Sequence, residues 1–192
     1  LNFKVGNGLF KKLWVSSPSS TLASDGLGPL YNARSCQRCH LKDGRGHPPL
    51  LNEPTTSMFL RLSIPAVGAE VDRYGAFPTT PEPTYGEQFQ DFAVPGLLSE
   101  GHWSVAYEES QVIMHGGEVV SLRKPHYTIE LNNFGALHPD TLISPRIAPQ
   151  MIGLGLLEAI PEADILAWVD PDDLNNDGIS GRANWVDSHE FP

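Results

Sequence analysis

Long apolar runs are absent from this sequence of 192 residues. The longest, Met151 to Ile160, is interrupted by glycines and by Glu158, and it falls far short of the roughly 18 residues that a membrane-spanning helix needs. Basic residues are also scarce, with 13 Lys and Arg against 23 Asp and Glu and a formal net charge of −10. The short apolar runs predict that the chain does not span a membrane. Because a net negative charge repels polyanions, we also expect that it does not bind nucleic acid.

The first four residues, Leu1 to Lys4, contain neither an initiator Met nor a basic-then-apolar signal peptide, so we expect a processed or trimmed piece of a longer product. Breaker residues, by contrast, are abundant. The 18 glycines and 17 prolines exceed the roughly 12% that these two types normally supply. We expect one domain with much irregular chain.

Cysteine is the scarcest informative residue, and both copies lie in one motif. Cys36 and Cys39 are three positions apart, and His40 follows directly. Cys-x-x-Cys-His predicts covalent attachment of haem c, in which each thiol adds to a vinyl group and the imidazole binds the iron. A redox disulfide, a zinc site or two ordinary buried cysteines are the alternatives. Since haem thioether bonds are made outside the cytoplasm, one covalent haem c also predicts an exported, periplasmic protein.

The second axial ligand decides whether the iron carries electrons or admits a substrate. The thioether candidates are Met58, Met114 and Met151, and Met151 is favoured because it lies eleven residues before Glu162, at the expected start of the last helix. Core packing is the alternative role for Met151. Six further histidines are weaker candidates: His47, His102, His115, His126, His138 and His189. Of these, His115 and His126 lie in the expected insertion and are candidates for lining a pocket.

Two other groups of residues are candidate ligands. Arg34 and Arg45 flank the motif and suit haem propionates, although solvated arginines are an equal alternative. Asp173, Asn175 and Asp177, followed by Gly178, match the first half of a calcium loop. The twelfth position of that loop lacks the bidentate carboxylate, so an acidic turn is the simpler interpretation and calcium the alternative.

Periodicity predicts a helix within residues 3–14 and another over 161–169. Between them, residues 62–145 are rich in proline and contain strand-like segments at 103–107, 118–122 and 127–131, the last two separated at Pro125. We therefore predict a mainly α fold in a single domain 1–192. Its core would comprise residues 1–61 and 146–170, with a loop and β insertion at about 62–145 and an acidic tail at 170–192.

The helices and the haem motif together resemble the class I cytochrome c fold, which implies that Gly6, Phe10 and Trp168 meet where the terminal helices cross. Several segments resemble the di-haem thiol oxidoreductases related to bacterial di-haem cytochrome c peroxidases, namely 6–10, 25–40, 43–46, 144–161 and 170–173. That family carries a second Cys-x-x-Cys-His in a further C-terminal domain, which this sequence does not contain. The resemblance implies the N-terminal haem domain of a di-haem protein or a single-haem relative.

The sequence thus predicts an exported electron-transfer domain with one covalent haem c, served by a redox partner protein or a second haem domain. An enzyme is the first alternative: a peroxidase or thiol oxidoreductase with an open distal site, needing a second haem outside this chain. The second alternative is a binding module without haem, stabilised by a Cys36–Cys39 disulfide and calcium.

Overall fold

The computed structural model describes residues 2–50, 53, 55–68 and 78–185. Its contacts divide the chain into two compact units, Leu1–Met151 and Ile152–Pro192. The first unit contains the Cys-x-x-Cys-His motif and every β-sheet of the described residues. The second contains two short helices followed by an acidic loop.

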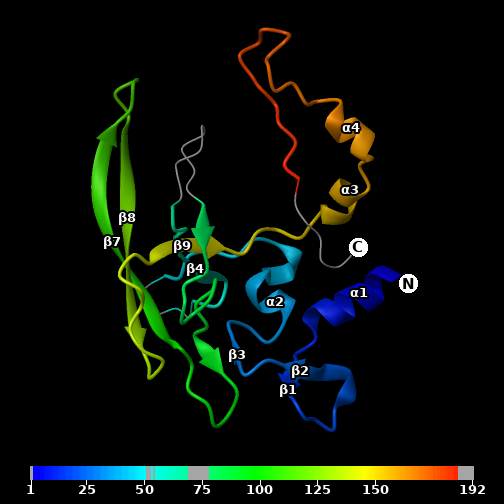
Figure 1. Ribbon diagram of the computed structural model, residues 1–192, viewed down its shortest axis with the longest axis vertical. Coiled ribbons are helices and arrows are strands. Elements are labelled where there is room, and N and C mark those ends of the chain that lie inside the picture. The colour runs from blue at the N-terminus through cyan, green and yellow to red at the C-terminus, as the bar shows by residue number, and fades with distance from the viewer. Residues whose placement is uncertain (1, 51–52, 54, 69–77, 186–192) are drawn as a thin grey trace. The chain divides into compact units, whose positions relative to one another are not determined.

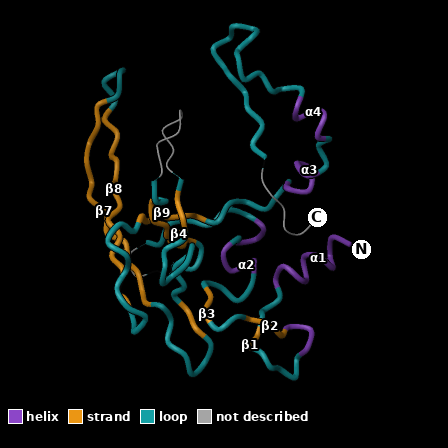
Figure 2. The backbone as a smooth tube through the Cα atoms, in the orientation of Figure 1, coloured by secondary structure: helices purple, strands orange, loops and turns teal. Residues whose placement is uncertain are grey.

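The first unit begins with the helix α1 (Asn2–Lys11), a short parallel pair of β1 (Val15–Ser16) and β2 (Asp25–Leu27), and the strand β3 (Leu30–Tyr31). The one-turn helix α2 (Cys36–Cys39) follows and leads into a 3-10 turn (Leu41–Asp43). β3 pairs with β6 (Phe92–Ala93), where the rings of Tyr31 and Phe92 stack at 5.9 Å. Most of this part of the chain is loop (Figure 2).

A three-stranded sheet in the order β5-β4-β9 lies at the centre of the first unit. β4 (Met58–Pro65) pairs antiparallel with β5 (Thr79–Thr80) on one side and with β9 (Leu142–Ile147) on the other. The register of the second pair runs from Met58 opposite Ile147 to Ser63 opposite Leu142. The residues that follow β9, 148–151, therefore lie near the start of β4.

The long ribbon of β7 (Gly101–Ile113) and β8 (Val119–Leu131) projects beyond this sheet (Figure 1). Its base is buried and its distal half is exposed. Pro125 lies within β8 opposite Tyr107, so the two strands predicted on either side of it are one. In a ribbon of two strands every outward-facing N–H lacks a ladder partner, so a proline is tolerated there.

The core lies between β4, the base of the ribbon and the segment before β6. Alternate residues of β4 point inward, as the two-residue period of a strand requires. The buried members of the core are Met58, Leu60, Leu62, Tyr85, Phe89 and Trp103. They are packed against partly buried residues of the ribbon and of β9.

The prediction of a mainly α fold is wrong. Among the described residues the helices are α1, α2, α3 (Leu154–Glu158) and α4 (Glu162–Leu166), and only α1 exceeds five residues. The predicted helix 161–169 is thus reduced to α4. Strands supply the hydrophobic core, because frequent prolines and glycines interrupt helical runs while the β-branched segments pair. No helix in the described part of the chain is long and apolar enough to cross a membrane.

Candidate haem site

The haem motif forms a single helical turn with its histidine at the end. Ser35 enters in an extended conformation, and the His40 N–H donates to the Cys36 carbonyl at 3.0 Å. A spacing of three residues places Cys36 and Cys39 on one face of the turn. Lys42 and Asp43 then adopt positive φ angles of 53° and 62°, which reverse the chain immediately after the motif.

The His40 ring is oriented by a contact far away in sequence. Its Nδ1 lies 2.6 Å from the Pro149 carbonyl oxygen. Because a carbonyl only accepts, Nδ1 carries the proton of the neutral ring and Nε2 keeps its lone pair. Metal-binding histidines are usually held in this way by a second hydrogen bond. The Phe10 ring of α1 packs near the imidazole, with centroids 6.3 Å apart.

Three backbone bonds hold the segment that carries Pro149. The Gly46 N–H donates to Ala148 O at 2.8 Å, the Ala148 N–H to Ser57 O at 3.0 Å, and the Met151 N–H to Asp43 O at 2.9 Å. Residues 148–151 are thereby fixed beside the loop that follows His40. Pro149 and Met151 both reach the haem motif through this arrangement.

A cavity of about 720 Å³ opens in front of the motif, and Cys36, Cys39, His40 and Met151 all line it. This volume is in the range of cofactor pockets, and its lining is largely apolar and aromatic with a few amides. The remaining lining residues are Phe10, Trp14, Leu30, Tyr31, Asn32, Ala33, Ser35, Phe59, Gln88, Gln90, Ala148 and Pro149. Two thiols, one imidazole with a free Nε2 and one thioether on an apolar cavity fit a covalent haem.

Both cysteines are free thiols, and their environments differ. Cys36 is exposed, whereas Cys39 is half-buried and its Sγ donates to Thr56 O at 3.0 Å. Burial raises the pKa of the Cys39 thiol above its ordinary value, and the charges of Asp91 and Cys36 add to the effect. Cys39 is therefore a neutral thiol at pH 7.

Behind the cavity wall lies a buried carboxylate that sequence analysis did not single out. Asp91 is 7% exposed and accepts from Thr55 Oγ1 at 2.8 Å and from Asn32 Nδ2 at 2.9 Å. Burial raises the pKa of Asp91, outweighing these hydrogen bonds and the nearby His102. Gln88 donates to Asn32 Oδ1 at 2.5 Å and so joins the wall to this network. No local sequence pattern marks these residues, because three separate segments supply them.

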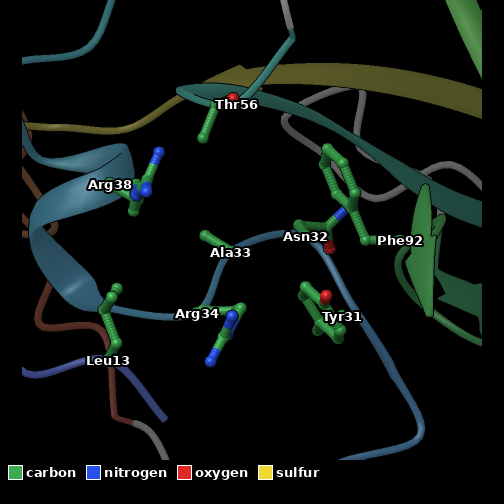
Figure 3. A pocket seen from close by; sticks show the side chains of 8 residues that line it. All are labelled: Leu13, Tyr31, Asn32, Ala33, Arg34, Arg38, Thr56 and Phe92. Atoms are coloured by element: carbon green, nitrogen blue, oxygen red, sulfur yellow. The ribbon is translucent and has the colours of Figure 1, made fainter. Parts of the chain in front are cut away.

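The two predicted propionate partners lie in different places. Arg34 donates through Nε to Trp14 O at 2.9 Å and lines a smaller hollow of about 190 Å³, which it shares with Arg38. Figure 3 shows Arg38 across this hollow from Phe92, with Ala33 and Asn32 between them and Arg34 and Tyr31 below. Arg45 is exposed and lines neither cavity. Arg38, which lies inside the motif itself, was missed.

Other candidate axial ligands lie away from the large cavity. Met58 is 5% exposed in the core, and Met114 and His115 belong to the turn at the tip of the ribbon. His126 contacts Glu108 at 3.1 Å, and His47 lies 3.8 Å from Glu53. His102 and His138 do not line the cavity either, and His189 lies outside the described residues. Met151 is the one predicted sixth ligand, among described residues, that the structure brings to His40.

The predicted calcium residues form a turn in the second unit. Asp173 Oδ1 accepts from the Asp177 N–H at 3.0 Å, and Asn175 Nδ2 donates to Asp177 Oδ2 at 3.1 Å. Asp173, Asn176 and Gly178 adopt positive φ angles, which coil the turn around these oxygens. Within the described ranges no group of three or more His, Cys, Asp and Glu residues is arranged to hold a metal ion. Calcium binding at this turn stays a prediction.

The predicted helix crossing joins residues of both units. Gly6 and Phe10 belong to α1 in the first unit, and a Cβ at Gly6 would meet nothing within 4 Å. Trp168 follows α4 in the second unit. Since the two units are described separately, the crossing stays a prediction, and Phe10 contributes instead to the cavity in front of His40.

Comparison with protein families gives one match. The family model described as "Di-haem oxidoreductase, putative peroxidase" matches residues 2–190. No curated protein and no solved structure is detectably similar to the chain. The match covers both cysteines, His40 and every residue that lines the large cavity.

Proposed function

Because the chain belongs to the di-haem oxidoreductase family, we propose that residues 36–40 bind one haem c covalently and that the domain transfers electrons. The family supports a haem cofactor and an oxidoreductase role. The observation that carries the finer proposal is the geometry of the His40 ring, whose Nδ1 lies 2.6 Å from Pro149 O. The proton is therefore on Nδ1, and the lone pair of Nε2 is the one that would bind iron. Cys36 and Cys39 supply the two thioethers, and a covalent haem supplies a one-electron redox centre.

The chain's own residues would orient and shield the group. Phe10, Trp14 and Phe59 line the cavity and exclude water from its apolar part. The amides of Gln88 and Gln90 line it as well and offer hydrogen-bond donors to carboxylates. The Asn32 amide also lines it, but Asn32 Nδ2 already donates to Phe89 O and to Asp91 Oδ1. Arg34 remains the cationic candidate for a propionate, whereas the exposed Arg45 has no place in the cavity wall.

Met151 is the proposed sixth ligand, because it is the thioether that lines the cavity. A Met and His pair holds the iron low-spin and raises its potential, as a carrier requires. The test is the visible spectrum of the haem-loaded protein and of Met151→Ala. We expect a low-spin spectrum with a weak charge-transfer band in the oxidised wild type, and loss of both in the variant. An unchanged spectrum in Met151→Ala would remove Met151 from the iron.

A second function is favoured by how Met151 is tethered. The Pro149 carbonyl contacts the nitrogen of His40 that points away from iron, and Met151 follows two residues later with its N–H bound to Asp43 O. These bonds hold the Met151 backbone near the Nδ1 side of the His40 ring, the side that would face away from iron. A Met151 side chain that stays on this side would leave a bound haem without a sixth protein ligand, and the domain would then act as a peroxidase or thiol oxidoreductase. A high-spin spectrum in the wild type would select this alternative.

Covalent attachment is tested separately from axial ligation. Acid-acetone extraction should leave the colour with the protein, and the intact mass should exceed that of the chain by one haem. Cys36→Ala and Cys39→Ala should each retain one thioether and shift the reduced α-band to longer wavelength. Colour that passes into the solvent would contradict the proposal for both functions.

The chain contains one Cys-x-x-Cys-His and no further cysteine. We propose that the second haem implied by the family belongs to a further domain or to a partner, and that the protein is exported to the periplasm, where haem thioethers are made. Expression with and without an export signal tests this point. Only the exported protein should acquire covalent haem.

A further inference from the structure

Basic charge is concentrated in the first 46 residues of this acidic chain. That segment contains seven basic residues against Asp25 and Asp43, a formal net charge of +5, whereas the whole chain carries −10. The remaining residues therefore carry −15. The basic residues are Lys4, Lys11, Lys12, Arg34, Arg38, Lys42 and Arg45.

The structure gathers several of these cations at the haem motif. Lys12 Nζ lies 5.0 Å from the centroid of the Trp14 ring, which lines the large cavity. Arg34 and Trp14 are joined by two hydrogen bonds, the Trp14 N–H to Arg34 O at 2.8 Å and Arg34 Nε to Trp14 O at 2.9 Å. Arg38 lies on α2 between the two cysteines and shares the smaller hollow with Arg34 (Figure 3).

We define the basic face as Lys11, Lys12, Arg34, Arg38 and Lys42. All except the half-buried Lys12 are exposed, and so is Cys36 beside them. Acidic side chains contribute little here. Asp25 and Asp43 are half-buried and Asp91 is buried. Glu53 is the exposed exception, and it lines a hollow together with Arg38. Among the described residues of the first unit, the exposed charge around Cys36 is therefore predominantly positive.

We propose that the basic face is the docking surface for an acidic redox partner protein, which exchanges electrons through the edge of the haem held by Cys36. This inference rests on the proposed function. At physiological salt the Debye length is about 8 Å, so a partner that approaches this face responds to the charges within about that distance more than to the net charge of the chain. Complementary charge of this kind raises association rates and fixes orientation.

Small charged redox reagents distinguish control of the electron-transfer rate by the basic face from control by the net charge of the molecule. Reduction of the haem-loaded protein by anionic Fe(II)-EDTA and by cationic hexaammineruthenium(II) is followed by stopped flow between about 0.1 and 1 M salt, where the Debye length falls from about 10 to 3 Å. We expect the rate with Fe(II)-EDTA to fall by about tenfold over this range, and the rate with the ruthenium complex to rise. Control by the overall charge of −10 predicts the opposite pattern and would overturn the proposal.

Matched variants locate the effect. Arg38→Glu with Lys42→Glu changes the net charge from −10 to −14, and it should remove or invert the salt dependence with Fe(II)-EDTA. Lys11→Glu with Lys12→Glu is a second variant on the same face. Lys124→Glu with Arg146→Glu makes the same change in charge at exposed positions of β8 and β9, and it should leave the salt dependence as in the wild type. An equal effect in this control would overturn the proposal.

A second measurement does not depend on haem. Hexacyanochromate(III), a paramagnetic anion that is inert to redox exchange, should broaden the backbone NMR signals of residues 10–14 and 34–42 selectively. The Arg38 and Lys42 variant should lose this broadening, and the Lys124 and Arg146 control should keep it. Uniform broadening would refute the basic face even in a protein that binds haem. Selective broadening in a chain that fails to bind haem would refute the proposed function alone.

Discussion

Gly46 is the position where one added methyl group should disturb the haem site most directly. The residue is buried, and a Cβ there would lie 2.7 Å from both Cβ and the carbonyl oxygen of Ser57. Real Cβ contacts essentially never fall below 3.0 Å. The obstructing atoms belong to the residue that leads into β4, not to the end of a flexible side chain. Gly46 does not have a positive φ angle, so the cost of Gly46→Ala is steric.

The expected loss has two parts. Overpacking of this kind costs roughly 1–3 kcal/mol, and weakening of the bond from the Gly46 N–H to Ala148 O removes about 0.5–1.5 kcal/mol more. The sum is a large fraction of the roughly 5–15 kcal/mol that stabilises a typical domain. Because Ala148 precedes Pro149, the same displacement loosens the bond that orients His40. Gly46→Ala should therefore lose haem incorporation as well as stability.

Urea unfolding followed by tryptophan fluorescence measures the first effect, and the haem-to-protein absorbance ratio measures the second. Gly8→Ala in α1 is the matched control, because a Cβ there meets nothing within 4 Å. It should stabilise the helix by up to about 1 kcal/mol. A urea midpoint for Gly46→Ala equal to that of the wild type would refute the close approach of the 44–48 loop to Ser57, and with it the placement of Pro149.

Three further predictions concern buried polar groups. Glu82 is 2% exposed; burial alone would raise its pKa, but the N–H groups of Tyr85, His138 and Thr84 lower it below the ordinary value. The Glu82 carboxylate therefore stabilises the fold fully above its unfolded pKa near 4.3, and this stabilisation is lost as pH falls through its folded pKa. Calorimetry should show that Glu82→Gln lowers the unfolding free energy by about 1–3 kcal/mol at pH 7 and by much less near pH 3. The pKa of Asp91 is raised by burial, so its negative charge opposes folding increasingly as pH rises above about 4. In urea unfolding, the stability of Asp91→Asn relative to the wild type should grow from pH 4 to 7. A difference that does not change with pH would contradict burial as the cause. Tyr85→Phe removes the bond from the Tyr85 hydroxyl to Gly135 O at 2.5 Å and should lower the unfolding free energy by roughly 0.5–1.5 kcal/mol. Tyr31→Phe, at a half-buried position, is the comparison.

Sequence reasoning found the haem motif because five consecutive residues carry it. It also selected Met151 from its position relative to the last helix, and the structure brings Met151 to the cavity of His40 for a different reason, the pairing of β9 with β4. The fold class was predicted wrongly. The mainly α prediction rested on short stretches of helical periodicity around Phe10 and Ile165. The largest fully buried apolar side chains are instead those of Leu60, Leu62 and Phe89. Asp91 and Gln88 could not be found, because their roles depend on tertiary contacts.

The pairing of β4 with β9 also determines how the haem site closes during folding. The contact between His40 and Pro149 joins residues 109 positions apart, and closing so long a loop directly has a high entropic cost. Once Met58 is opposite Ile147, the remaining loop is about 20 residues, and the logarithmic dependence on loop length lowers the closure cost by about 1.5 kcal/mol. The motif turn is local and forms without this step. The cysteines of the motif therefore do not depend on the register of β4 and β9, whereas the support of the imidazole does. A slip of two residues in this register would leave the proposed attachment site in place but His40 without the Pro149 carbonyl.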